Sequence, residues 1–175
     1  GGATAGDVTV FGLSGGTAAI DVRIQGVLRT TFTATVRGGV VRGTVFGASP
    51  RMRLDLMINT MTHRALTTGR ISVTGGQAWR PHVHVRDIAT AFLMAAEAPH
   101  DRATGEVFNV GSDHNNFTIA EAAAMVAAEI PGTQIDSLDT VEDLRSYRVS
   151  FDKVRHVLGF TANYTIEDGV REVRE

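Results

Sequence analysis

From residue 40 onward, short apolar stretches rich in β-branched residues alternate with longer stretches whose apolar residues recur every three or four positions. The first kind is typical of buried strands and the second of amphipathic helices. When strands alternate with helices, each helix carries the backbone back across the sheet, so that successive strands run parallel. The sequence therefore predicts an α/β fold with a largely parallel sheet. The expected strands are VVRGTVFG (40–47), RISVTG (70–75), GEVFNVGS (105–112) and QIDSL (134–138).

Capping signals mark where the expected helices begin and end. Thr118 and Glu121 have the spacing of a capping box, followed by apolar residues on one helical face. The stretch 51–68 has apolar residues at helical spacing and is followed by Gly69, a residue type that commonly ends a helix. The other expected N-caps are Asp87, Ser150 and Thr165 with Asp168, and Gly159 is a further expected helix end.

Residues 1–42 differ from the rest of the chain in composition. They are rich in glycine and threonine and contain β-prone stretches such as TTFTATV, so we expect an irregular or β-rich segment. We therefore divide the chain into 1–42 and 43–175. Gly12, Gly15 and Ala18 have the spacing G-x-x-G-x-x-A, but neither an amphipathic helix nor a strand ending in an acid follows them. A dinucleotide-binding loop requires both features and is not predicted here.

Charge and composition exclude several classes of partner. The formal net charge is -2 and the 17 basic residues are scattered, so we expect no nucleic-acid partner and no membrane partner. The chain has no cysteine, which excludes disulfides and thiolate metal sites. The first residues lack a basic stretch followed by an apolar one, so no secretory signal is expected. These features favour a cytoplasmic protein with a small-molecule ligand.

The segment WRPHVHVRD concentrates side chains able to do chemistry. In a strand, His82 and His84 share one face, while Val83 and Val85 on the other face anchor the strand in the core. The planar guanidinium of Arg80 suits a two-pronged contact with a phosphate. Two alternatives stay open. In the first, His84 is a hydrogen-bonded core residue and Arg80 pairs with an acid. In the second, His82, His84 and Asp87 bind a metal.

A second polar cluster lies in EDLRSYRVSFDK, immediately before an expected helix. Loops at such positions often face a ligand, and Arg145 is suited to act as a second clamp on a diphosphate. Tyr147 and Arg148 lie in the same loop. The alternative is that these residues are solvated loop charges.

From about Gly43 onward, several landmarks occur in an order that resembles the second half of extended short-chain dehydrogenases/reductases. They are TVFGASPRMRLDLMIN, WRPHVHVRDIATAFLMAAEAP, GEVFNVGS, DLRSYRVSFDKVRHVLGF and TIEDGVREV. The resemblance is to the nucleotide-sugar type, the NAD-dependent epimerase/dehydratase family. It implies the C-terminal, substrate-binding part: a partial Rossmann-like parallel sheet with a small α/β substrate-binding subdomain.

The same resemblance implies roles for individual residues. Asn59, Arg80, Arg145 and Tyr147 match positions that contact the diphosphate of a nucleotide-sugar substrate. Thr44 and Val45 match the strand beside the nicotinamide of NAD or NADP, the cofactor of the parent family.

Catalysis in the family relies on Tyr-x-x-x-Lys, in which the lysine lowers the pKa of the phenol. Tyr147 and Tyr164 are the only tyrosines and Lys153 is the only lysine, so the motif is missing and no catalytic residue is predicted. A truncated or fused gene, a misread upstream frame and a diverged non-catalytic protein would each explain this, and we favour the first two.

We expect an inactive fragment of an epimerase or dehydratase (oxidoreductase, isomerase or lyase chemistry) that contributes diphosphate binding and does not bind NAD(P) by itself. The alternatives are a non-catalytic nucleotide-sugar binding module and a metal-dependent enzyme built on His82 and His84. A homodimer is not predicted.

Overall fold

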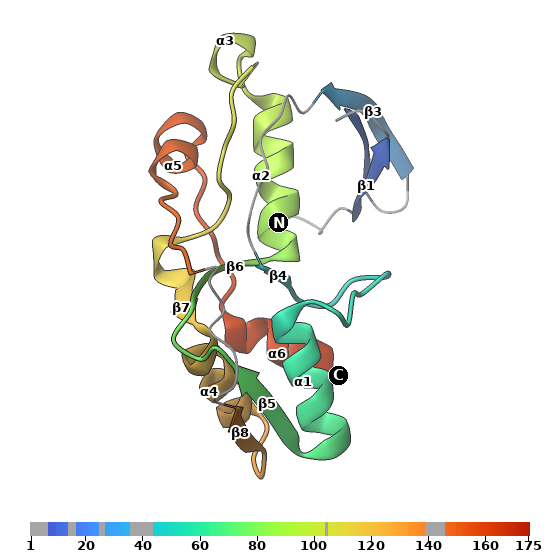
Figure 1. The fold of residues 1–175 in the computed structure, drawn as a ribbon. Coiled ribbons are helices and arrows are strands. Elements are labelled where there is room, and N and C mark those ends of the chain that lie inside the picture. Colours follow the sequence, from blue (N-terminus) through green and yellow to red (C-terminus); the bar gives the residue numbers. More distant parts are fainter. Residues whose placement is uncertain (1–6, 14–16, 25–26, 36–43, 104, 139–145) are drawn as a thin grey trace. The chain divides into compact units, whose positions relative to one another are not determined.

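The computed structural model describes residues 7–13, 17–24, 27–35, 44–103, 105–138 and 146–175 (Figure 1). The chain divides into two compact units. The smaller unit comprises residues 1–40 with 105–107, and the larger unit comprises 41–104 and 108–175.

The smaller unit contains an antiparallel three-stranded sheet. Its strands β1 (Asp7–Leu13), β2 (Thr17–Ile24) and β3 (Val27–Thr35) pair in the order in which they occur along the chain. The prediction of β structure in this segment is confirmed. Gly12 pairs with Ala18 across the β1–β2 hairpin, so the glycine-rich stretch connects two strands and does not open a helix, while Gly15 lies outside the described residues.

The larger unit contains two parallel strand pairs. Strand β4 (Thr44–Phe46) runs parallel to β6 (Trp79–His84), and β5 (Arg70–Thr74) runs parallel to β8 (Gln134–Leu138). A short antiparallel strand, β7 (Asn116–Thr118), pairs with the other side of β6. The α/β class with parallel strands is confirmed. The strand predicted at 105–112 is wrong, because this stretch pairs with no strand among the described residues.

Helices connect these strands. They are α1 (Met57–Thr68), α2 (Val85–Glu97), α3 (His100–Ala103), α4 (Ile119–Glu129), α5 (Asp152–Leu158) and α6 (Ile166–Arg174), with a 3-10 turn at Asp113–Asn115. The predicted helix ends at Gly69 and Gly159 are confirmed, since both glycines adopt the left-handed conformation at a C-cap. Both predicted capping boxes, at the starts of α4 and α6, are present.

Two predicted caps and one strand assignment are wrong. Helix α2 is capped by His84, whose Nδ1 accepts a hydrogen bond from Arg86 N at 3.2 Å. Asp87 lies in the first turn and accepts backbone N–H groups of another segment instead. Val85 is the first residue of α2 and does not continue the strand. At α5 the boundary residue is Phe151, although the Ser150 hydroxyl still accepts a bond from Asp152 N at 3.3 Å.

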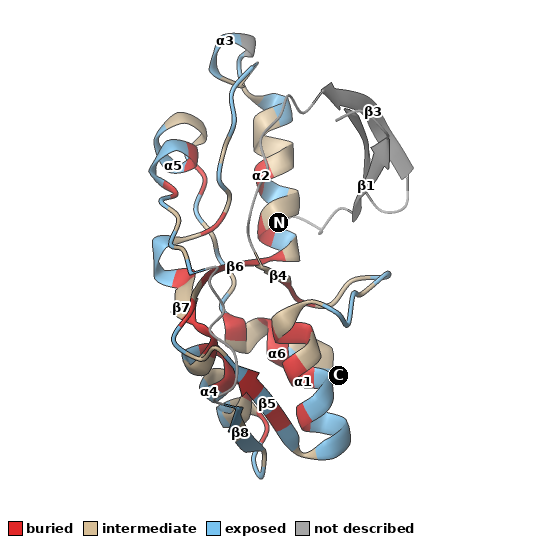
Figure 2. Cartoon of the chain, viewed as in Figure 1, coloured by how far each residue is buried: buried red, intermediate tan, exposed pale blue. Residues whose placement is uncertain are grey.

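The larger unit is built around two apolar clusters, and β6 is buried along most of its length (Figure 2). One cluster joins α1, β5, α4 and α6, and the other joins α2 with the segments around α5. The larger cluster contains Phe46, Ile58, Met61, Ala65, Ile71, Val73, Ala78, Ile119, Ala122, Ala123, Val126, Ile130, Ile166 and Val170. Among the described residues no helix has the length and apolar character needed to cross a bilayer.

Candidate functional site

The side chains of Arg80 and Tyr147 meet at the start of β6. The Arg80 guanidinium carbon lies 5.5 Å from the centre of the Tyr147 ring, a distance suited to a cation–π contact. Arg80 is only 9% exposed, and its Nη1 donates to the carbonyl of Trp79 at 2.8 Å. Two residues that the sequence analysis selected from separate clusters are therefore neighbours in the fold.

Hydrogen bonds fix the loop that carries Tyr147 against β6 and β7. Tyr147 N donates to Trp79 O at 3.2 Å, and Trp79 N donates to the Ser146 hydroxyl at 3.1 Å. Further along, the Asn116 side chain accepts from Val149 N and donates to Val149 O, both at 3.1 Å. These bonds explain how a loop without regular secondary structure holds its side chains in defined places. Arg145, the predicted second clamp, lies outside the described residues.

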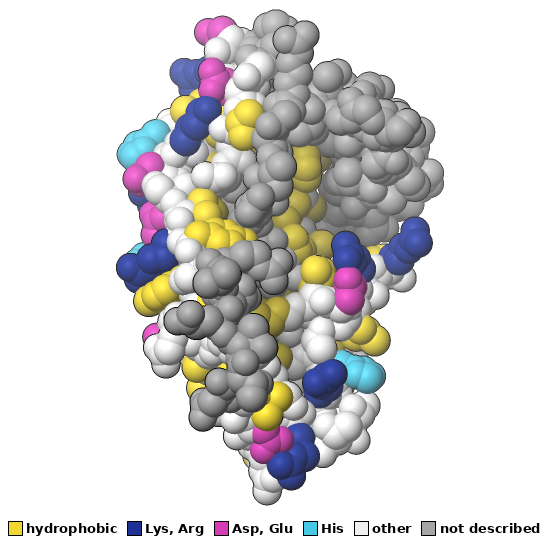
Figure 3. Space-filling model, viewed as in Figure 1, with side chains coloured by type: hydrophobic (Ala, Val, Ile, Leu, Met, Phe, Trp, Pro, Cys, Tyr) yellow, Lys and Arg dark blue, Asp and Glu magenta, His cyan; other side chains and the backbone are white. Residues whose placement is uncertain are grey.

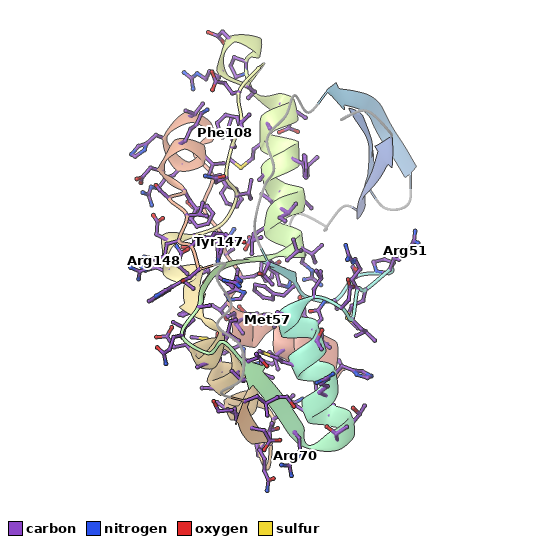
Figure 4. All side chains as sticks on the ribbon, in the orientation of Figure 1. Arg51, Met57, Arg70, Phe108, Tyr147 and Arg148 are labelled. Atoms are coloured by element: carbon purple, nitrogen blue, oxygen red, sulfur yellow. The ribbon has the colours of Figure 1, made fainter. Side chains whose placement is uncertain are left out.

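A second cation–aromatic pair, which the sequence analysis missed, lies next to the first. The guanidinium carbon of Arg148 lies 3.7 Å from the centre of the Trp79 ring. Figure 4 shows Tyr147 and Arg148 close together at this end of β6, while Arg51 and Arg70 lie far from them. The signal in the sequence was an aromatic residue directly before Arg80 together with an arginine directly after Tyr147. Elsewhere on the face shown in Figure 3, basic side chains are scattered among acidic ones.

His82 is a fully buried imidazole that has no hydrogen-bond partner for either ring nitrogen among the described residues. Its ring stacks on Phe117, with 6.4 Å between the ring centres and 27° between the planes. Burial, and secondarily the charge of Arg80, lower the pKa of His82 to about 4. The side chain is therefore neutral at physiological pH, and the positive charge at this place on β6 belongs to Arg80.

His84 shares a strand face with His82 but has different surroundings. Its ring stacks on Tyr164 at 4.5 Å and meets the edge of Phe46 at 5.2 Å, both between ring centres. Its Nε2 lies 3.1 Å from Glu172 Oε2. Burial lowers the pKa of His84, and the Glu172 carboxylate opposes that shift. His84 therefore acts as a hydrogen-bonded structural residue.

Asp87, in the first turn of α2, is a third buried polar residue near the end of β6. Its carboxylate accepts Asn163 N at 2.9 Å and Tyr164 N at 3.2 Å, and burial raises its pKa more than these two donors lower it. Because His84 and Asp87 are committed to these partners, they do not converge with His82 on one point. No group of three or more potential metal ligands occurs in the part of the chain that the structure describes.

Asn59 lies in the first turn of α1 and is buried. Its Oδ1 accepts a hydrogen bond from Gly47 N, and its Nδ2 donates to Arg53 O, both at 3.1 Å. The amide therefore joins α1 to the loop that follows β4. One N–H of the Asn59 amide lies outside this pair of bonds, since the amide group carries two hydrogens.

Thr44 and Val45 are the first two residues of β4 and are half-buried. In the parallel pairing with β6, Thr44 aligns with His82 and Val45 aligns with Val83. The structure thus places the two predicted cofactor contacts on the strand beside the one that carries Arg80.

Comparison with known proteins gives a family match in sequence. Residues 33–111 match the model of the NAD dependent epimerase/dehydratase family. UDP-D-apiose/UDP-D-xylose synthase 2 of Arabidopsis thaliana is 38% identical over 69 residues, which is 37% of this chain. UDP-D-apiose/UDP-D-xylose synthase 1 of the same plant is 36% identical over 73 residues, or 40% of this chain. Each match spans 18% of the length of the plant protein.

Solved structures extend the likeness to the fold. MoeE5 in complex with UDP-glucuronic acid and NAD superposes with a TM-score of 0.58 at 28% identity, over 75% of this chain and 44% of that chain. UDP-glucuronic acid 4-epimerase from Bacillus cereus, in complex with UDP-glucuronic acid and NAD, gives a TM-score of 0.63 at 21% identity. This match covers 75% of this chain and 42% of the epimerase chain. The order of the sequence landmarks, the parallel strand pairs and these matches agree, and over the matched part the chain is similar to the NAD-dependent epimerase/dehydratase family.

Proposed function

We propose that the larger unit binds a nucleotide sugar through its diphosphate, with Arg80 as the main contact. The observation that carries this proposal is the meeting of Arg80 and Tyr147, which come from two segments far apart in the sequence, with 5.5 Å between the guanidinium carbon and the ring centre. A guanidinium offers several N–H donors in one plane, a geometry that fits the oxygens of a phosphate. The ring of Tyr147 supports one side of that group and limits its rotation.

Four further residues complete the proposed contacts with the diphosphate and the cofactor region. Arg145 is proposed as a second clamp on the diphosphate. Asn59 is proposed to donate one N–H of its side-chain amide to the diphosphate, while the other N–H stays bonded to Arg53 O. Thr44 and Val45 remain the predicted contacts to a nicotinamide, because β4 lies directly beside β6.

The described residues do not fit the pyrophosphate of NAD(P). In a Rossmann-type site, the glycine-rich loop leads into a helix whose N-terminal N–H groups receive the pyrophosphate. Here Gly12 and Ala18 pair across an antiparallel hairpin, so no helix starts at that point. Tyr-x-x-x-Lys is also missing from the sequence. We therefore propose substrate binding without turnover for this chain, as a fragment of a nucleotide-sugar epimerase or dehydratase or as a non-catalytic binding module. We do not propose the metal-dependent enzyme.

Isothermal titration with UDP-glucuronic acid, UDP-glucose and dTDP-glucose tests the proposal. We expect at least one of them to bind, and Arg80→Ala to weaken that binding by ~10- to 100-fold, the usual effect of losing hydrogen bonds to a charged group. Arg64→Ala removes an exposed arginine of α1 and is the matched control, with no change expected. Fluorescence of Trp79, the single tryptophan, checks that each variant is folded.

Failure of the wild-type protein to bind any of the three nucleotide sugars would contradict the proposal. Equal affinities of wild type and Arg80→Ala would contradict the role given to Arg80.

A further inference from the structure

Glu172, in the last turn of α6, contacts three segments of the larger unit. Its Oε2 lies 3.1 Å from His84 Nε2 at the end of β6, and the same oxygen accepts a hydrogen bond from Ala48 N at 3.4 Å. Its Oε1 lies 3.3 Å from the guanidinium of Arg86 in α2. One carboxylate therefore links the C-terminal helix to the end of β6, the loop after β4 and the start of α2.

Consecutive backbone N–H groups of the loop after β4 are held by two different elements. Gly47 N donates to the side chain of Asn59 at 3.1 Å, and Ala48 N donates to Glu172 at 3.4 Å. Gly47 has a φ of 104°, and a Cβ at this position would lie 2.2 Å from His84 Nε2. The loop therefore passes directly against the His84 ring, and a shift of the ring or of α6 would move the backbone to which Asn59 is bonded.

Helix α6 is itself firmly anchored, so it can serve as a fixed support. Its N-terminus has a capping box, and Arg171 makes two hydrogen bonds to the Glu129 carboxylate, at 2.9 and 3.0 Å. A Cβ at Gly169 would lie 2.4 Å from the Phe46 ring, which shows how closely α6 packs against the end of β4. Glu172 thus extends from a helix that is held by its cap, by Arg171 and by its packing against Phe46.

We propose that Glu172 is a positioning residue: by holding His84 and the Ala48 N–H, it fixes the loop after β4 and so orients Asn59 toward a bound nucleotide sugar. The last step rests on the proposed function, since it requires Asn59 to contact the ligand. The first step, the fixing of the loop, stands independently of any ligand.

The hydrogen-bond directions around His84 give the proposal a spectroscopic signature. Because Arg86 N donates to Nδ1, the ring proton resides on Nε2, which donates to the Glu172 carboxylate. Nitrogen NMR of the wild-type imidazole should show a single tautomer with hydrogen on Nε2. Without the carboxylate, the preference for that tautomer should weaken.

Hydrogen exchange of backbone amides, resolved by NMR, tests the first step in wild type, Glu172→Ala, Glu172→Gln and Glu167→Ala. We expect the Gly47 and Ala48 amides to exchange at least ~10-fold faster in Glu172→Ala, as for loss of a hydrogen bond to a charged group. Glu172→Gln retains an acceptor oxygen of the same size and should recover part of the protection. Glu167 lies on the same helix and makes no hydrogen bond to Gly47 or Ala48, so Glu167→Ala should resemble wild type.

Titration of the same variants with UDP-glucuronic acid tests the second step, and we expect Glu172→Ala to bind more weakly than Glu167→Ala. Unchanged exchange at Gly47 and Ala48 together with an unchanged His84 tautomer in Glu172→Ala would overturn the proposal. Faster exchange with equal affinities of the two alanine variants would overturn the link to Asn59. If exchange and tautomer respond but the wild type binds no nucleotide sugar, the proposed function fails while the role of Glu172 in holding the loop stands.

Discussion

We expect acidification to destabilise the larger unit through His82, and replacement of this residue by phenylalanine to remove that effect. An ordinary histidine has a pKa of 6.5, which burial lowers to about 4 at His82. Between these values the unfolded chain binds a proton that the folded chain does not, so the free energy of unfolding falls as the pH decreases. The loss begins near the unfolded-state pKa and is complete below the folded-state pKa.

The two pKa values set the size of the effect. At about pH 5 the imidazole is almost fully protonated in the unfolded chain and mostly neutral in the folded one. The free energy of unfolding is therefore ~2 kcal/mol lower at this pH than at about pH 8. The limiting loss at still lower pH is ~3 kcal/mol. Phenylalanine has no nitrogens to leave unpaired and can stack on Phe117, so His82→Phe should also be ~1 kcal/mol more stable than wild type at about pH 8.

Urea unfolding followed by Trp79 fluorescence measures both the loss of stability with pH and the difference in stability between wild type and His82→Phe. The single tryptophan is a suitable probe because it lies on the same strand as His82. Other groups titrate in wild type and variant alike, so they cancel in the difference between the two proteins. His63→Gln, which removes an exposed imidazole from α1, is the control. If wild type and His82→Phe lose equal free energy of unfolding between about pH 8 and pH 5, then burial does not lower the pKa of His82 in the folded protein.

Two further substitutions test the packing around β6. Gly47→Ala places a Cβ 2.2 Å from the His84 ring at a φ of 104°, so we expect a loss of at least ~3 kcal/mol in urea unfolding. Gly132→Ala, at a φ of 89° with open space around it, should cost only ~1 kcal/mol, and equal losses would argue against the clash. Asp87→Ala leaves the backbone N–H groups of two residues without their acceptor, so we expect a loss of ~2 kcal/mol and faster hydrogen exchange at Asn163 and Tyr164. Unchanged exchange at those amides would refute the role of Asp87.

Several features that depend on a few consecutive residues were predicted correctly from the sequence, although the caps at Asp87 and Ser150 were not. The capping box of Thr118 and Glu121 and the left-handed C-cap at Gly69 depend only on side chains and backbone sterics within one helical turn. The α/β class also followed from local periodicity. The strand predicted at 105–112 failed because apolar composition cannot show whether a neighbouring strand is present to bond with.

The sequence also identified Arg80 as a candidate, because a guanidinium suits an anion wherever it lies in the fold, and the family resemblance added Tyr147. By itself, therefore, the sequence determined the class of the fold, several helix ends and the residue types available for binding. The tertiary structure alone decided that His82 has no hydrogen-bond partner in the described part of the chain, while His84 bonds to Glu172, 88 residues away. It also decided that Asp87 caps a distant loop and not its own helix. The reason is physical. The hydrogen bonding and protonation of a buried polar group depend on which distant segment packs against it, and the residues next to that group in the sequence do not show which segment this is.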